Sequence, residues 1–158
     1  MRNARIHPRL LGYLGRALSL ELSAVQQYLT QAVLTQAWGL AEAAERFRAE
    51  TAEEMQHAER IVQRMLMLGV APNASQLRPA GVARTLPDLL LQDAALEDEI
   101  VALYAEAVDF CRRIGDGDNA AFFDALLREE QAHAQEIDEW LAQLGVRVMP
   151  EAAERAYF

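Results

Sequence analysis

The sequence predicts an all-α protein in which four long helices pack as one bundle, with a long crossover between the second and third helices. Alanine, leucine, glutamate, glutamine and arginine dominate the 158 residues, and all five favour helices. No stretch shows the alternating polar and apolar pattern of strands joined by turn pairs. Two short connections flank one long connection, which is the order expected for a bundle with a single crossover.

The first two helices are bounded by Pro8 and Gly69. The first helix is expected from about Pro8 to Trp38, because proline suits a first helical position and apolar residues recur every three or four positions. This apolar stripe consists of Leu11, Leu14, Leu18, Leu22, Val25 and Leu29. After a tight junction at Trp38-Gly39, the second helix is expected to run to about Leu68, with Gly69 as its stop.

The crossover and the last two helices follow from turn residues. The stretch from Val70 to Leu86 contains prolines and glycine and is expected to be the long connection. The third helix is expected to begin near Thr85, a candidate N-terminal cap, and to end near Gly115. Asp118 is a candidate cap for the fourth helix, which is expected to end near Gly145.

The tail from Val146 to Phe158 contains Pro150 and is expected to add one or two turns, as a short C-terminal fifth helix. The length suits a single domain, residues 1–158. Hydrophobic residues make up 52% and charged residues 25%, which is typical of a globular protein and argues against disorder.

The charge balance is acidic, with 24 Asp and Glu against 15 Lys and Arg and a net charge of −9. Nucleic acid is therefore not an expected partner, because phosphate contacts need clustered basic side chains, and cations are the natural partners. No apolar run approaches the roughly 20 residues that cross a bilayer, so no membrane association is expected, and no secretory signal is visible. With Cys111 as the single cysteine, a cytoplasmic location is expected.

The chain contains an internal repeat with an offset of 76 residues. The offset pairs Glu21 with Glu97, Glu54 with Glu130, and His57 with His133. The windows 47–61 and 123–137 share seven identities in fifteen positions, where chance gives roughly one or two. Each half is therefore expected to be a helix pair that carries one glutamate and then, after 32 intervening residues, Glu-x-x-His.

The Glu-x-x-His spacing places both side chains on one face of a helix, because positions i and i+3 are neighbours. Around Glu54 and His57 this face also carries Phe47, Glu50, Ile61 and Met65, so it is expected to point into the core. Four buried carboxylates need counter-charges, which two divalent cations would supply. Carboxylate and imidazole donors suit iron or manganese, and di-iron carboxylate bundles use this constellation. The alternative is solvated helix faces with incidental histidines.

At these positions the sequence resembles the bacterioferritins, the haem-containing branch of the ferritins, over essentially its whole length. The shared motifs are Glu21-Leu-x-Ala-x-x-Gln-Tyr28, Trp38-Gly39, Glu54-Met55-x-His57-Ala58, Leu96-Glu97 and Glu129-Glu130-x-x-His133. The second histidine separates this chain from the other ferritins, and the cysteine motifs of rubrerythrins do not occur in it.

The resemblance implies a di-iron ferroxidase site within each subunit. Its ligands would be Glu21, Glu54, His57, Glu97, Glu130 and His133. Glu54 and Glu130 would bridge the irons, and the remaining glutamate and histidine of each half would complete one iron. The implied reaction oxidises two Fe(II) with dioxygen or hydrogen peroxide to a bridged diferric centre. Ferric mineral then forms inside a shell of twenty-four subunits built from dimers, and a ferredoxin is the implied partner for iron release.

Met55 is the haem ligand that the resemblance implies. It lies about 100° around the helix from Glu54 and therefore points away from the core-facing stripe. One Met55 from each of two subunits would ligate a shared haem b across a two-fold axis. The alternative is packing at a helix-rich interface, for which methionine is also well suited.

Three features depart from the pattern of the resembled family. Its inner-surface iron site uses a histidine and an aspartate where this chain has Ala49 and Glu53, which leaves Glu50 and Glu53 as candidates. Trp140 lies one helical turn later than the corresponding tryptophan, and the tail 146–158 differs from the family's fifth helix. An altered inner iron route and pore are therefore expected.

Tyr28 and Tyr104 follow Glu21 and Glu97 by two helical turns. Each can donate a hydrogen bond to a ligand carboxylate or act as a redox side chain, and the resemblance favours a role beside the ligands for Tyr28. Burial against some other acceptor is the alternative. Five acidic side chains are expected on solvated faces: Glu42, Glu45, Asp88, Asp93 and Glu99.

The leading interpretation is an iron-storage ferroxidase. A di-iron oxidase or peroxidase that stores no iron would use the same ligands, and assembly separates these two functions. A non-catalytic haem-binding subunit within a mixed shell is a third class, which rapid Fe(II) oxidation would exclude.

Overall fold

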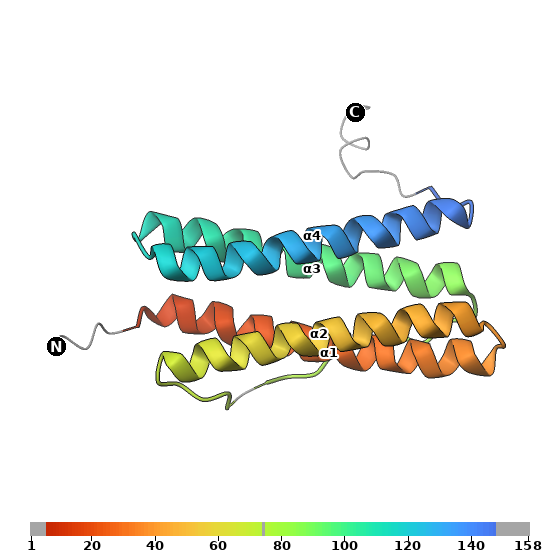
Figure 1. The fold of residues 1–158 in the computed structure, drawn as a ribbon, viewed down its shortest axis with the longest axis horizontal. Helices are drawn as coiled ribbons and strands as arrows, with labels where there is room; N and C mark the ends of the chain where they lie inside the picture. The colour runs from red at the N-terminus through yellow and green to blue at the C-terminus, as the bar shows by residue number, and fades with distance from the viewer. Residues whose placement is uncertain (1–5, 74, 148–158) are drawn as a thin grey trace, which may run out of the picture.

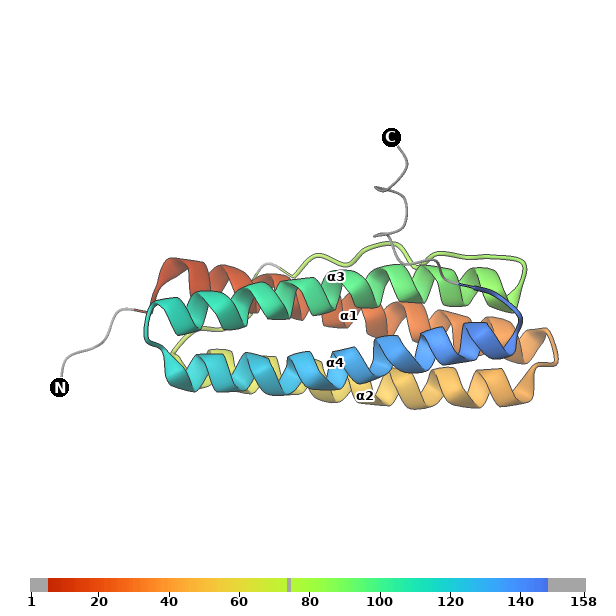
Figure 2. The same ribbon diagram turned by 90° about the horizontal axis from the view of Figure 1, so that it is seen from above.

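The computed structural model describes residues 6–73 and 75–147, which form the predicted bundle of four helices (Figure 1). The helices are α1 at Pro8–Ala37, α2 at Ala41–Met67, α3 at Leu86–Arg113 and α4 at Gly117–Gln143. α1 and α2 form one hairpin, α3 and α4 form the other, and the long crossover joins them (Figure 2). The all-α bundle fold is therefore confirmed. The expected fifth helix lies outside the described residues.

The helix ends agree with the sequence, with one correction. Thr85 caps α3 as predicted, because its side chain accepts a hydrogen bond of 3.3 Å from the N–H of Asp88. The prediction of Asp118 as the cap of α4 is wrong. Asp116 is the cap, and its carboxylate accepts a hydrogen bond of 3.1 Å from the N–H of Asn119. Because α4 begins at Gly117, Asp118 already lies within its first turn, two residues beyond the cap.

The internal repeat extends to the two hairpin turns. Gly39 and Gly115 lie 76 residues apart, and their φ angles are +78° and +75°. Glycine adopts this left-handed conformation without steric cost. In both turns the residue after the glycine donates a hydrogen bond of 2.9 Å to the carbonyl five residues earlier. The two hairpins therefore end their first helices in the same way.

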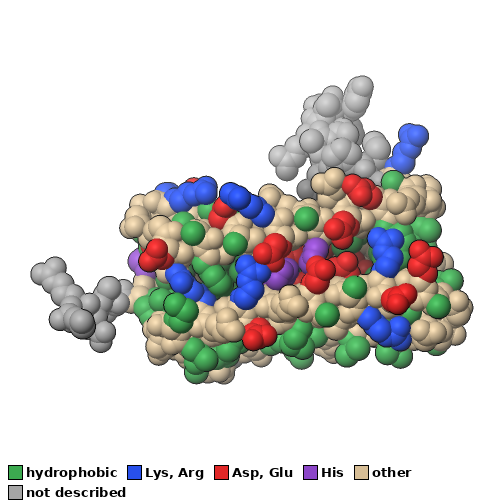
Figure 3. All heavy atoms as spheres, in the orientation of Figure 1, with side chains coloured by type: hydrophobic (Ala, Val, Ile, Leu, Met, Phe, Trp, Pro, Cys, Tyr) green, Lys and Arg blue, Asp and Glu red, His purple; other side chains and the backbone are tan. Residues whose placement is uncertain are grey.

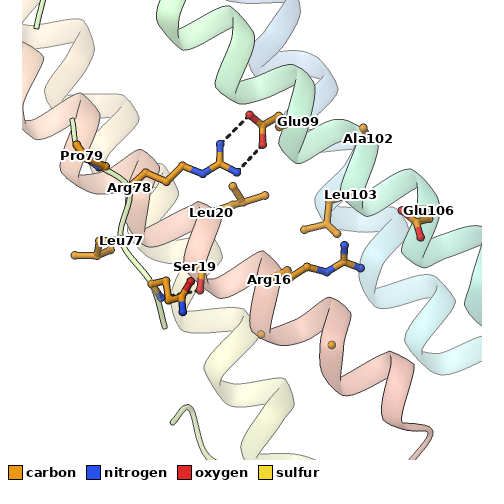
Figure 4. A pocket seen from close by; sticks show the side chains of 13 residues that line it. Arg16, Ser19, Leu20, Leu77, Arg78, Pro79, Glu99, Ala102, Leu103 and Glu106 are labelled. Atoms are coloured by element: carbon orange, nitrogen blue, oxygen red, sulfur yellow. Dashed lines mark hydrogen bonds and ion pairs between the residues drawn. The ribbon is translucent and has the colours of Figure 1, made fainter. Parts of the chain in front are cut away.

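The crossover lies along α1 and α3 and is hydrogen-bonded to both helices (Figure 2). The N–H groups of Gln76 and Arg78 donate hydrogen bonds of 3.0 Å to the hydroxyls of Ser19 and Ser23 on α1. The guanidinium of Arg78 donates two hydrogen bonds of 2.7 Å to the carboxylate of Glu99 on α3. A groove of about 790 Å³ lies between the crossover and these two helices (Figure 4).

The core is apolar toward its ends and polar in the middle of the bundle. Phe47 and Phe123, which the repeat relates, are both fully buried. The predicted stripe on α1 is wrong at Leu29, which is 52% exposed, whereas Tyr28 and Gln31 are buried. Because polar side chains fill the middle of the core, apolar periodicity alone misplaces the buried face there. Within the described ranges, no helix combines the length and apolarity needed to span a bilayer.

Candidate metal centre

The six residues proposed as ligands meet in the middle of the bundle, and all four helices contribute to the cluster. All four carboxylates are fully buried, and the two histidines are nearly so. The residues form two overlapping groups in which one ligand atom from each member lies within 4.8 Å of the others. These groups are Glu21, Glu54, His57 and Glu130, and Glu54, Glu97, Glu130 and His133. The shared members are the two carboxylates predicted to bridge.

Glu54 and Glu130 each lie between the two imidazole rings. Oε2 of Glu54 is 3.1 Å from Nδ1 of His57, and Oε1 is 2.9 Å from Nδ1 of His133. Oε1 of Glu130 is 2.7 Å from Nδ1 of His57, and Oε2 is 3.4 Å from Nδ1 of His133. Each carboxylate thus offers one oxygen to each half of the repeat, as a bridging ligand requires.

The histidines and the central carboxylates stabilise each other's charged forms. Burial opposes a protonated imidazole, but hydrogen bonds to Glu130 and Glu54 outweigh it and raise the pKa of His133 to about 12. The pKa of His57 also rises, because hydrogen bonds to Glu130, Glu21 and Glu54 outweigh its burial. Burial opposes ionisation of Glu54 and Glu130, yet hydrogen bonds with the two histidines lower the pKa of both carboxyls.

The outer carboxyls, Glu21 and Glu97, behave in the opposite way. Burial raises the pKa of both well above the usual range, and the charges of Glu54 and Glu130 add to the effect. These two groups therefore favour the protonated form. Protonated histidines, ionised Glu54 and Glu130, and protonated outer carboxyls, the forms that these directions favour, would together give the cluster no net charge. Two divalent cations with four carboxylates and two neutral imidazoles would do the same.

Two buried tyrosines hold the outer carboxyls in a crossed arrangement. The hydroxyl of Tyr28 on α1 donates a hydrogen bond of 2.5 Å to Oε1 of Glu97 on α3. The hydroxyl of Tyr104 on α3 donates to Oε1 of Glu21 on α1. Each tyrosine thus orients a carboxyl of the other hairpin through one oxygen and does not occupy its second oxygen.

The carboxylate oxygens inside the cluster suit cations. Among the described residues, Oε2 of Glu97 is buried without a hydrogen-bond partner, whereas Oε2 of Glu21 lies 3.6 Å from Nδ1 of His57 and the oxygens of Glu130 form ion pairs with the two histidines. Buried polar atoms without a partner are costly, and such atoms in native proteins often mark an ion or a catalytic role. Carboxylate oxygens and imidazole nitrogens are donors that iron and manganese accept.

The outer nitrogens of both histidines lie against acidic side chains on the α2–α4 face (Figure 3). Nε2 of His57 is 2.8 Å from Glu129, and Nε2 of His133 is 2.5 Å from Glu53. The repeat relates Glu53 to Glu129. A carboxylate on the outer nitrogen orients an imidazole whose other nitrogen binds a metal. Sequence reasoning assigned no such role to Glu129. The available signal was that an acid stands directly before the ligand glutamate in both halves of the repeat, as Glu53-Glu54 and Glu129-Glu130.

Three further predicted residues, Glu50, Glu53 and Met55, have definite places. Glu50, Glu53 and His133 can bring ligand atoms within 4.8 Å of each other, so the two candidates for an inner iron position do lie together. Met55 is 50% exposed on α2 and points away from the cluster.

The prediction of a solvated Asp93 is wrong. Its side chain is fully buried between α1 and α3, where it accepts hydrogen bonds from Gln27 and Gln31. The other four predicted surface acids are exposed. Hydropathy alone assigns an aspartate to solvent. The internal repeat holds the signal that could have found Asp93, because the equivalent position in the other half is the apolar residue Ala17.

Comparisons with known proteins identify the family of the chain. The family model of the ferritin-like domain matches residues 11–145. The bacterioferritin of Rhodobacter capsulatus is 36% identical over 125 residues, which cover 79% of this chain and 78% of that protein. The bacterioferritin of Mycobacterium leprae is 32% identical and covers 87% of each chain.

A solved structure of the Rhodobacter capsulatus bacterioferritin superposes with a TM-score of 0.83 at 33% identity. The superposition covers 87% of this chain and 86% of that one. That structure is described as having a metal-free dinuclear site and its haem iron in a crystallographic special position.

Proposed function

The chain belongs to the ferritin-like family and, within it, to the bacterioferritins, and on this premise we propose that it is an iron-storage ferroxidase. Fe(II) is the substrate, and the cluster of four carboxylates and two histidines is where it is oxidised. One observation carries the proposal: two groups of four ligands overlap in Glu54 and Glu130, so the residues can hold two cations side by side. When bound there, Fe(II) supplies one electron per ion to dioxygen or hydrogen peroxide.

The protein's own residues have distinct tasks in this function. Glu54 and Glu130 lie between both positions, Glu21 with His57 completes one, and Glu97 with His133 completes the other. Tyr28 and Tyr104 fix one oxygen of each outer carboxyl and leave the other free to bind. Glu53 and Glu129 orient the imidazoles from outside.

Proton release is the counterpart of metal binding in this cluster. The directions of their pKa shifts favour protonated histidines and protonated outer carboxyls when no cation is present, which is four protons more than neutral imidazoles and carboxylates hold. Metal ligands must be deprotonated, so two divalent cations would displace up to about four protons per subunit. The overall charge of the buried cluster then stays at zero, which avoids the cost of an isolated buried charge.

Haem binding is proposed at Met55. Its thioether is exposed on α2, and α1 of the same hairpin exposes Leu29 and Val33, which are 52% and 61% exposed. Large exposed apolar side chains on one hairpin suit a second copy of the chain with a shared apolar cofactor. Replacing Met55 with alanine should remove the haem absorbance and leave Fe(II) oxidation intact. Loss of both would show that Met55 serves the fold instead.

The ferroxidase proposal is tested by removing ligands. Glu54→Ala and His133→Ala should each abolish fast Fe(II) oxidation, followed by absorbance, while helicity by circular dichroism is kept. Glu45→Ala is the matched control, because Glu45 is an exposed acid on the same helix as Glu54. Oxidation at the parent rate in the two ligand variants would refute the assignment of the metal centre.

The storage part of the proposal is tested by assembly. We expect a closed homo-oligomer of about 420 kDa, the mass of some twenty-four copies, with haem absorbance that elutes with it. A monomer or dimer without haem would instead assign the same centre to an oxidase or peroxidase that stores no iron. The cytoplasmic location, the single domain over residues 1–158 and a ferredoxin partner stay predictions.

A further inference from the structure

Asp93 is a buried carboxyl group that the proposed ferroxidase centre does not use. It lies on α3, one helical turn before Glu97, and its side chain is fully buried. Its Oδ1 accepts hydrogen bonds of 2.7 Å from the side-chain amides of Gln27 and Gln31 on α1. Among the residues that the structure describes, its Oδ2 has no hydrogen-bond partner, and neither has Oε1 of Gln31. A native protein rarely leaves such atoms without a reason.

The repeat shows that the fold does not require these polar groups. We call Gln27, Gln31, Glu50 and Asp93 the polar layer. The offset of 76 residues relates them to Leu103, Ala107, Leu126 and Ala17, which we call the apolar layer. Every member of the apolar layer is buried. The same bundle therefore packs this layer with apolar side chains on the other side of the centre, and the polar version points to a function.

The polar layer has one member at an outer cavity and another beside a histidine of the metal centre. Gln27 lines a cavity of about 150 Å³ under the crossover, bounded also by Arg78 and Glu99, which are labelled in Figure 4. At the other end of the layer, Glu50 lies 3.8 Å from Nε2 of His133. Asp93 thus accepts a hydrogen bond from Gln27, which lines the cavity, and lies one helical turn from the proposed ligand Glu97.

The charges around Asp93 favour its neutral form. Burial raises the pKa of Asp93 to about 7, although the amides of Gln27 and Gln31 favour the carboxylate. The titratable groups whose charge couples to Asp93 are Glu50 on α2 and Tyr28 on α1. Both are acids, so neither offers the positive charge that a buried carboxylate needs. Divalent cations at the centre would supply that charge from a short distance.

We propose that Asp93 is a proton-binding site linked to the metal centre: it holds a proton while the centre is free of metal and releases it when divalent metal binds. The proton leaves the Asp93 carboxyl for water on the side of the Gln27 cavity, and the carboxylate left behind offsets part of the positive charge of the bound cations. This inference rests on the proposed metal centre, but it concerns a residue outside the ligand set.

Proton counting tests the inference without any redox step. Zn²⁺ is added to the full-length, metal-stripped protein in weak buffer with a pH indicator, and bound zinc and released protons are both counted. The wild type and Asp93→Asn should bind the same two zinc ions per subunit. At pH 6.5 the wild type should release about 0.5 to 1 more proton per subunit, and at pH 9 the difference should vanish, because Asp93 is then already ionised.

Matched variants separate Asp93 from general effects. Asp109→Asn removes an exposed aspartate from the same helix and should release as many protons as the wild type at both pH values. If Asp93→Asn does not fold, Asp93→Ala takes its place, because it copies the residue at the repeat-related position.

Three results would overturn the inference. Equal proton release by wild type and variant at pH 6.5, with equal zinc, would mean that Asp93 is not linked to the centre. One zinc ion fewer in the variant would mean that the polar layer binds a cation rather than a proton. No zinc bound by the wild type would instead contradict the metal centre itself.

Discussion

The polar layer and the apolar layer flank the same metal centre at equivalent positions, yet only one of them is built as a hydrophobic core. In the apolar layer, Leu103 and Leu126 are buried without polar atoms, and each contributes about 1.5–3 kcal/mol by its burial. In the polar layer, Asp93 and Glu50 each leave a buried oxygen without a hydrogen bond, which costs about 1–3 kcal/mol each. The difference teaches that the repeat preserves the ligands strictly while the layers around them have diverged.

Exchanging residues between the layers should have the largest effect on the free energy of unfolding. Leu126→Glu places a carboxylate in the apolar layer and should cost about 4 kcal/mol or more, because nothing there pairs with it. Glu50→Leu makes the reverse exchange and should raise the free energy of unfolding at pH 8 by about 1–2 kcal/mol. The pKa of Glu50 is raised to about 7, mainly by burial, so its ionised form is the unfavourable one at that pH.

Thermal unfolding of the metal-stripped protein at pH 8 measures both effects. If Glu50→Leu destabilises the protein as much as Leu126→Glu does, the two layers are energetically equivalent and the comparison fails.

A single substitution in the polar layer should have the next largest effect, and its size should depend on pH. The pKa of Asp93 is higher in the folded protein than the usual value, so the folded state binds the proton more tightly and stability falls as pH rises toward 7. Asp93→Asn should therefore stabilise the metal-stripped protein by about 2 kcal/mol at pH 8, within the ~4 kcal/mol that such a shift allows.

The gain from Asp93→Asn should shrink toward zero near pH 4, where aspartate itself is protonated. Unfolding midpoints across this pH range measure it. A gain that is constant with pH would show that shape rather than charge distinguishes the polar layer.

Replacing either crossed tyrosine should lower the free energy of unfolding by the same amount, because the repeat relates the two positions. Tyr28→Phe and Tyr104→Phe each leave one oxygen of a buried carboxyl without its donor and should cost about 1–2 kcal/mol. We expect the two values to agree within about 0.5 kcal/mol when unfolding is measured under the same conditions. A much larger difference would mean that the influence of the polar layer, which acts on the pKa of Tyr28 through Asp93, extends to the ligand carboxyls.

The smallest effect is expected outside the core. Arg60 forms an ion pair of 2.7 Å with Glu129, whereas the repeat places Glu136 at the position of Arg60 in the other half. The pair is partly exposed, so Arg60→Gln should change the free energy of unfolding by less than about 0.5 kcal/mol. A cost above 1 kcal/mol would show that this pair holds His57 in place through Glu129.

Much of the bundle could be predicted because helix signals are local. Thr85, the paired glycines of the turns and the apolar face of α2 each reveal a boundary or a face from neighbouring residues alone. The grouping of the six proposed ligands was also predictable, since the repeat places them at matched heights on the four helices. Whether they hold iron stays a prediction that the Fe(II) and zinc experiments address.

The errors have a common physical cause. Leu29 was expected in the core and Asp93 in solvent, because hydropathy assigns apolar side chains to the core and charged side chains to the surface. Near the metal centre that rule reverses. There the buried face of α1 carries Gln27, Tyr28 and Gln31, whose side chains hydrogen-bond to acids on α3. Burial at such a layer depends on partners from a distant helix, which local periodicity does not contain.

The crossed tyrosines also bear on how such a protein could have arisen. Because Tyr28 serves the carboxyl on α3 and Tyr104 serves the carboxyl on α1, neither hairpin contains a complete set of oriented ligands. A half-length ancestor with this sequence pattern could have built the centre only by pairing with an identical copy, each chain completing the other's site. Duplication and fusion of such a chain would then free the two halves to diverge, as the two layers have done.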